Sequence, residues 1–129
     1  MREIKFRGFN RKNNVWLYGF YLQNRGAHFV CPDEFATGKT WEDYEIDPDT
    51  LGQYTELKDE KGKEIYDGDI VRNYGIVGNP EFVVRITNGS SEAVSLQNGS
   101  VCLLRKLLNI GPTYIIGNMY DNPEPIKED

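Results

Sequence analysis

The carboxylates Asp43, Glu45 and Asp47 are the residues whose type and spacing best suit chemistry in this sequence. Paired carboxylates perform general acid and base catalysis, although such clusters also occur in solvated loops. A second stretch, ATGKT at residues 36–40, resembles the end of a phosphate-binding loop, but Asp33 replaces the first glycine that this motif requires. One histidine and two distant cysteines give no zinc-ligand spacing. We therefore expect no metal, no cofactor and no defined catalytic residue.

These observations favour a non-enzymatic binding or assembly module. The alternative is a small carboxylate-dependent hydrolase or nucleic-acid-processing enzyme that uses the acidic segment. The two differ in a testable way, because the enzyme requires a deep cleft lined by two or more close acids.

Charge is distributed unevenly along the chain. Residues 1–32 carry six Lys or Arg and one Glu, whereas residues 33–69 carry four Lys and thirteen Asp or Glu. Opposite charges attract, so these blocks can meet within one chain or between copies. We expect a homo-oligomer in which the basic N-terminal hairpin faces acidic residues of a neighbour. The candidate contact residues are Arg7, Arg11, Trp16, Tyr18, Glu42, Asp43 and Glu45.

Other partners follow from the same composition. A host or phage protein is the second class of partner that we expect. Nucleic acid is a weaker alternative, because an acidic chain repels phosphates, although the aromatic residues beside the basic ones suit base stacking. Alternation along a strand places Trp16, Tyr18 and Phe20 on one face. We expect either this set or the opposite set, Val15, Leu17 and Tyr21, to be core.

Alternating apolar residues and closely spaced turn residues predict short antiparallel strands. We expect a mainly β (β-rich α+β) fold, with an N-terminal hairpin and small sheet followed by a small SH3-like antiparallel barrel. Residues 101–108 fit either the only real helix or an apolar strand, and residues 47–50 fit one turn of helix that begins with Pro48. The expected parts of this single domain, 1–129, are residues 1–66, the barrel-like part 67–124 and a tail 125–129.

Turn residues divide the second half of the chain into its expected elements. Gly62 is expected to take the left-handed conformation in the turn 59–62, and Gly68 to bend the chain into a buried strand. These turns should direct Ile65, Ile70 and Val71 inward. Two Asn-Gly pairs, at residues 88–89 and 98–99, predict further hairpin turns.

The compartment follows from what the sequence contains. The first residues are charged from Arg2 onward and contain no apolar run of signal-peptide length. No segment approaches the roughly 20 apolar residues of a membrane span. Cys31 and Cys102 read as small buried hydrophobic residues in a reducing compartment. We therefore expect a cytoplasmic protein of a bacterial cell without membrane association.

Four blocks of the sequence resemble the YopX family of small phage- and prophage-associated proteins. They are REIKFRGFN at 2–10, YGFYL at 18–22, DPDTLGQYTELKDEKGKEIYDGDIV at 47–71 and IIGNMYDNPE at 115–124. The family commonly has an Asp where this chain has Asn10, so no role of that Asp is transferred. The resemblance implies a mainly β protein with a barrel-like part and self-association in an infected or lysogenic host. It implies no activity, cofactor or catalytic residue.

Overall fold

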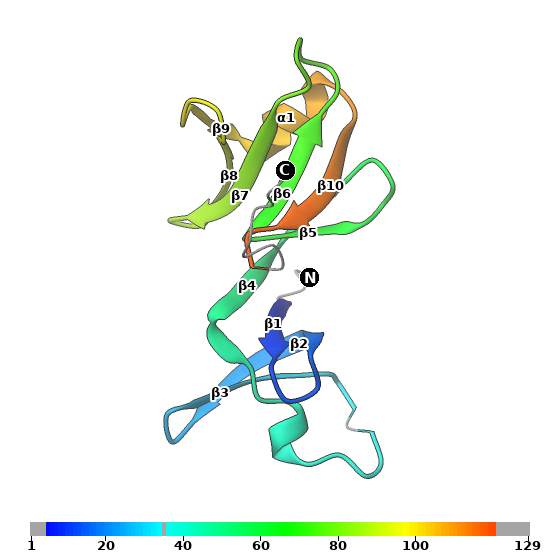
Figure 1. Cartoon of the computed structure of the whole chain (residues 1–129), viewed down its shortest axis with the longest axis vertical. Helices are drawn as coiled ribbons and strands as arrows, with labels where there is room; N and C mark the ends of the chain where they lie inside the picture. Colours follow the sequence, from blue (N-terminus) through cyan, green and yellow to red (C-terminus); the bar gives the residue numbers. More distant parts are fainter. Residues whose placement is uncertain (1–4, 35, 121–129) are drawn as a thin grey trace, which may run out of the picture. The chain divides into compact units, whose positions relative to one another are not determined.

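The computed structural model describes residues 5–34 and 36–120, and they form a mainly β protein (Figure 1). The chain divides into two compact units, of which unit 1 ends at Tyr54 and unit 2 begins at Thr55. This boundary lies inside one long strand. The expected parts with limits at residues 66 and 124 remain a prediction, and the tail 125–129 lies outside the described residues.

Unit 1 is built on three antiparallel strands that lie side by side in the order β3-β2-β1. The pairing of β1 with β2 confirms the N-terminal hairpin, and β3 confirms the third strand. Pro32 follows β3 directly and has no backbone N–H with which to continue the ladder. The three strands are β1 (Phe6–Asn10), β2 (Val15–Asn24) and β3 (Ala27–Cys31).

The helical turn expected at residues 47–50 is wrong, because β4 (Asp47–Lys58) begins there. Pairing with β1 decides the conformation: Phe9 lies opposite Asp47, and its backbone N–H donates to Thr50 Oγ1 at 2.8 Å. One 3₁₀ turn, η1 (Trp41–Asp43), forms earlier instead. Its start is fixed by the Thr40 N–H, which donates to Asp43 Oδ2 at 2.9 Å.

One continuous segment pairs with both edges of this arrangement and curls it. The Val30 N–H donates to the Tyr44 carbonyl at 3.0 Å, and the Ile46 N–H donates to the His28 carbonyl at 2.9 Å. The chain then continues directly into β4, which pairs with β1 at the opposite edge. The core of the unit collects Phe29, Cys31 and Tyr44.

Unit 2 contains a five-stranded antiparallel sheet in the order β10-β6-β7-β8-β9. A cluster of seven buried hydrophobic residues includes Leu104 and Leu107 of the helix α1, so the helix covers one face of the sheet. Among the described residues, the pairings leave β10 and β9 at the two ends of the row, and the SH3-like barrel remains a prediction. The elements are β5 (Glu64–Tyr66), β6 (Asp69–Asn73), β7 (Glu81–Thr87), β8 (Ser90–Ser95), β9 (Val101–Leu103), α1 (Leu104–Ile110) and β10 (Thr113–Asn118).

The structure of unit 2 confirms one expected hairpin turn and most of the expected buried residues. Asn88 and Gly89 both have positive φ, at 51° and 81°, as a tight hairpin turn between β7 and β8 requires. Residues 101–108 contain both alternatives, because β9 leads directly into α1. Ile65 and Val71 are buried as expected, but Ile70 is only half-buried. Neighbouring strand residues point to opposite faces, so Ile70 and Val71 cannot both face the helix.

Gly68→Ala is expected to lower the free energy of unfolding by about 1 to 3 kcal/mol. Gly68 has a φ of 97°, and an added Cβ would lie 2.7 Å from Tyr120 Cε2. Urea denaturation measures the loss. Gly62→Ala is the matched control, because Gly62 has a φ of 85° with open space around its Cβ position. A Gly68→Ala variant as stable as the wild type would contradict the strained turn.

Candidate functional site

Each of the predicted contact residues Arg11, Glu42 and Asp43 forms an ion pair within unit 1, but its partner, Asp47 or Lys12, was not among the predicted contacts. Arg11 Nη2 lies 2.8 Å from Asp47 Oδ2, and Lys12 Nζ lies 3.1 Å from Asp43 Oδ1 and 3.7 Å from Glu42 Oε1. The acidic segment that follows β3, which we call the acidic connection (residues 36–47), therefore folds back onto the basic hairpin of its own chain. The charge pairing that was expected between copies exists inside one copy, and the homo-oligomer itself remains a prediction.

Asn10 is the buried residue that fixes this arrangement, with 1% of its surface exposed. Its Nδ2 donates to the carbonyl oxygens of Glu42 and Glu45 at 3.1 and 2.7 Å, and its Oδ1 accepts from the Asn13 N–H at 2.7 Å. An ionised Asp has no donor and could not make the first two bonds. Asn10 therefore holds the acidic connection against the hairpin through its amide group.

The electrostatics of the acids follow from these contacts. The pKa of Asp43 lies well below its usual range because its carboxylate accepts from Asn13, the Thr40 N–H and Lys12. The pKa of Asp47 is lowered chiefly by Arg11 and then by the Asp49 N–H. In return, the hydrogen bond to Asp43 raises the pKa of Lys12. Both carboxylates are therefore held as anions near neutral pH.

A hollow of about 580 Å³ lies beside these ion pairs. Three of its lining residues are acids, so this hollow is the place where the enzyme hypothesis would put its catalytic carboxylates. Asp47 in it is bound to Arg11, and a carboxylate with a lowered pKa is a poor proton donor and a weak base. Among the described residues, no group of three or more His, Cys, Asp or Glu could hold a metal ion. The hollow is lined by Asn10, Arg11, Lys12, Glu42, Glu45, Ile46, Asp47 and Pro48.

Two of the predicted contact residues support the sheet from inside. Arg7 is 5% exposed, and its guanidinium lies 4.7 Å from the centroid of the Trp16 ring. Phe9 meets the same ring edge-on at 5.4 Å. Arg7 thus stacks on Trp16 and offers little charge to solvent. Tyr18, the other aromatic candidate, is 48% exposed.

The expectation that one face of β2 is core is met only in part, because Leu17 packs against the core of Phe29, Cys31 and Tyr44 without being fully buried. None of Trp16, Tyr18 and Phe20 is fully buried, and the same holds for Val15, Leu17 and Tyr21. The curled sheet is small, and its buried positions come from β1, β3 and β4 instead. We define the aromatic surface of unit 1 as the four exposed large hydrophobic residues in the part of this unit that the structure describes, Val15, Tyr18, Phe20 and Trp41. Sequence reasoning missed Trp41.

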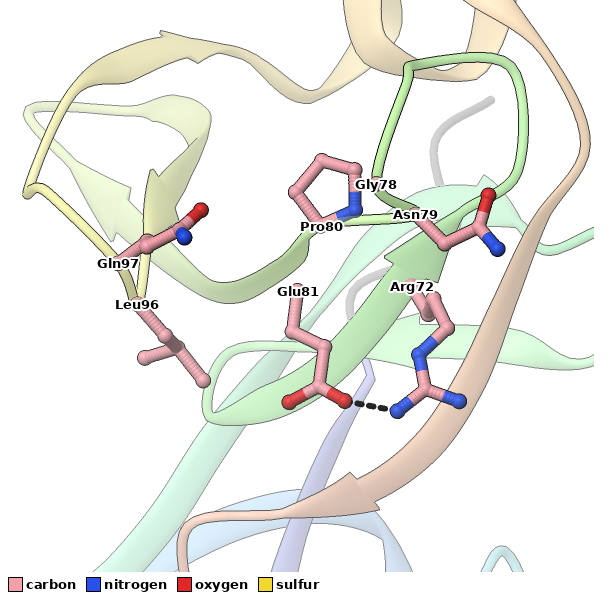
Figure 2. A pocket seen from close by; sticks show the side chains of 7 residues that line it. All are labelled: Arg72, Gly78, Asn79, Pro80, Glu81, Leu96 and Gln97. Atoms are coloured by element: carbon pink, nitrogen blue, oxygen red, sulfur yellow. Dashed lines mark hydrogen bonds and ion pairs between the residues drawn. The ribbon is translucent and has the colours of Figure 1, made fainter.

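A second hollow, of about 530 Å³, lies in unit 2 (Figure 2). Arg72 and Glu81 form an ion pair at its base, and Arg72 Nη1 also lies 3.5 Å from Tyr74 Oη. No sequence motif marks this place, because its residues come from three separate segments of the chain, at positions 72, 78–81 and 96–97. It is lined by Arg72, Gly78, Asn79, Pro80, Glu81, Leu96 and Gln97.

Comparison with known proteins decides the lineage. The family model described as YopX protein matches residues 5–127, which is nearly the whole chain. The chain belongs to the YopX family. This YopX chain also resembles the crystal structure of protein EF1440 from Enterococcus faecalis, with 21% sequence identity and a TM-score of 0.60. The match covers 98% of this chain and 100% of the other, and at this identity it shows the fold alone. No curated protein matches the sequence.

No helix within residues 5–34 and 36–120 is both long and apolar enough to cross a membrane.

Proposed function

We propose that the chain is a non-enzymatic binding or assembly module of a phage or prophage, acting in the cytoplasm of a bacterial host. Its partners are proteins, and they include further copies of the same chain. The observation that carries this proposal is a difference between two kinds of side chain in unit 1. Cationic side chains of the N-terminal hairpin are engaged within the chain, whereas large hydrophobic side chains are exposed.

The engaged cations argue against nucleic acid as the main ligand. Lys5 lies over the Tyr54 ring, Arg7 over Trp16, and Arg11 and Lys12 bind carboxylates. Phosphate contacts supply most of the affinity for nucleic acid, and these side chains would first have to leave their present partners. The side chains of the aromatic surface of unit 1 are between 44% and 53% exposed, so a partner protein can contact them where they stand. Exposed aromatic residues are typical anchors of protein interfaces.

The hydrolase alternative is less well supported by the acids themselves. Enzymes commonly raise the pKa of a catalytic carboxyl group by burial or by a neighbouring negative charge. Asp43 and Asp47 show the opposite, because cations and N–H donors surround them and lower their pKa values. They are suited to fixing the acidic connection.

Replacing Tyr18 and Phe20 together by serine is expected to remove protein partners other than further copies of the chain. These residues are 48% and 44% exposed, so the change should leave the fold intact while it deletes apolar contact area. Tagged wild-type and variant chains would be recovered from infected cells, followed by mass spectrometry and nucleic-acid sequencing. We expect one or more proteins that the wild type retains and the variant loses.

Val77→Ser is the matched control, because Val77 is 99% exposed and lies in unit 2. It should recover the same proteins as the wild type. Enrichment of specific nucleic acids, or an unchanged set of proteins with the double variant, would contradict binding through this surface. Light scattering on the purified chain at micromolar concentration tests the assembly half of the proposal, which a monomer mass at low and moderate salt would refute.

A further inference from the structure

The sheet of unit 2 has two different faces. Along β7, Phe82 and Val84 are buried in the core with α1, so the alternate residues Glu81, Val83 and Arg85 face the other way. The register extends this second face across the sheet, because paired residues of an antiparallel ladder lie on the same side. No helix of the described chain is part of a core on this side.

Four hydrophobic side chains form a row across the second face. Val83 pairs with Ile70 of β6 and with Val94 of β8, and Val94 pairs with Val101 of β9. Val101 is 56% exposed and the other three are half-buried. We call these four residues the apolar row. Its direction is perpendicular to the strands.

An ion pair flanks the apolar row on each side. On one side, Glu81 pairs with Arg72, and their side chains are 35% and 36% exposed. On the other side, Arg85 Nε lies 3.6 Å from Asp67 Oδ1, and their side chains are 41% and 21% exposed. Along β7, the acidic Glu81 and the basic Arg85 therefore lie two positions to either side of Val83.

We propose that a second copy of this chain packs on this face, sheet against sheet, about a two-fold axis that runs along the apolar row. This inference rests on the assembly half of the proposed function and names its surface. Rotation about that axis keeps each strand over its own equivalent and exchanges the two sides of the row. Apolar row then meets apolar row, and Arg85 of one copy faces Glu81 of the other.

The charge pattern selects a second copy as the occupant. Under the same rotation, Arg72 of one copy comes over the side of the sheet that carries Asp67 in the other. Both sides of the joint then hold alternating positive and negative groups, and no cation faces a cation along β6 or β7. Homodimers commonly use such isologous contacts, in which one patch is complementary to itself. An unrelated partner would place no such condition on the arrangement of charges.

The hollow in unit 2 fits the same geometry. It lies on the side of Arg72 and Glu81, with Leu96 and Gln97 as one wall (Figure 2). The rotation brings Arg85 of the second copy over this side, where the hollow gives the long side chain room beside Glu81. Extension of the sheet at β10 is a poorer alternative, because the Ile115 N–H at that strand is already bonded to Asp59 Oδ2 at 3.0 Å.

Two charge reversals test the proposal. Glu81→Arg places two cations opposite each other at both sides of the joint, and Arg85→Glu places two carboxylates there. Each variant alone is expected to associate with itself at least tenfold more weakly than the wild type, because like charges in an interface repel strongly. An equimolar mixture of the two variants is expected to form a mixed dimer, since position 81 of one chain then faces a group of opposite charge at position 85 of the other.

Analytical ultracentrifugation of each chain and of the mixture gives the masses, and circular dichroism shows that each variant is folded. Lys106→Glu is the control, because Lys106 is exposed on α1 and its reversal should leave association unchanged. A wild-type oligomer that both reversals leave intact, or a mixture that stays monomeric, overturns this surface while self-association stands. A monomeric wild type overturns both the surface and the assembly half of the proposed function.

Discussion

Gly19→Ala is expected to abolish the folded state of unit 1, or to lower its free energy of unfolding by at least about 3 kcal/mol. Gly19 lies in β2, where a Cβ would stand 1.9 Å from the Cys31 carbonyl oxygen and 2.6 Å from its carbon. Both atoms belong to the backbone, so no side-chain rotation can relieve the clash. The strands β2 and β3 would have to separate where Phe20 pairs with Cys31.

Tryptophan fluorescence during urea denaturation reports this unit selectively, because both tryptophans of the chain, Trp16 and Trp41, belong to it. Gly26→Ala is the matched control in the next turn. Gly26 has a φ of 83° but open space around its Cβ position, so only the backbone preference is lost, at about 1 kcal/mol. Equal losses in the two variants would show that β2 and β3 are less closely packed than described.

Local turn chemistry is the part of the fold that the sequence predicts best. Asn88, Gly89 and Gly62 all have positive φ where short turns were expected, because few other residues tolerate that conformation. Asp47 shows the limit of local reasoning. Its sequence context suits the start of a helical turn, but pairing with Phe9, 38 positions earlier, makes it the start of a strand. Tertiary pairing of this kind leaves no local signal.

The sequence suggested residues for a contact surface, whose role in binding stays a prediction, but it could not indicate which partners these residues have within the chain. Charge blocks indicated that Arg11 and Asp43 belong to complementary surfaces, but composition cannot distinguish a contact within a chain from one between copies. Asn10 decides the matter through two bonds to backbone carbonyls 32 and 35 positions away. A signal for η1 was present, since Thr40 and Asp43 have the spacing of a capping pair. The face around Val83 becomes visible only when the register of β6, β7 and β8 is known.

Asn73 is the residue on which the joint between β6 and α1 depends most, and it is fully buried. Its Nδ2 lies 3.0 Å from the Leu107 carbonyl oxygen, 3.3 Å from that of Gly111 and 2.8 Å from Thr113 Oγ1. Its Oδ1 accepts from the Gly75 N–H at 2.8 Å. The last carbonyl groups of a helix have no N–H donor within the helix. The Asn73 amide supplies a donor to such carbonyl groups at the C-terminal end of α1.

Asn73→Asp is expected to lower the free energy of unfolding of unit 2 by about 3 kcal/mol or more at neutral pH. The new side chain has the same shape and keeps the acceptor for Gly75, but it replaces the donor by an anion that faces carbonyl oxygens and the negative end of a helix. Urea denaturation followed by circular dichroism measures the loss. Hydrogen exchange of peptides from α1 should show faster opening of the helix end.

The pH dependence separates the loss of the donor from a mere loss of packing. Burial beside carbonyls raises the pKa of the new carboxyl group above its value in the unfolded chain, so the destabilisation is complete above the folded pKa and shrinks as pH falls through it. Asn98→Asp is the matched control, because Asn98 is exposed and uses only its oxygen, which accepts from the Ser100 N–H at 2.9 Å. It should change stability by less than about 0.5 kcal/mol. An Asn73→Asp variant with a small loss that does not vary with pH would show that the amide donor does not hold the helix end.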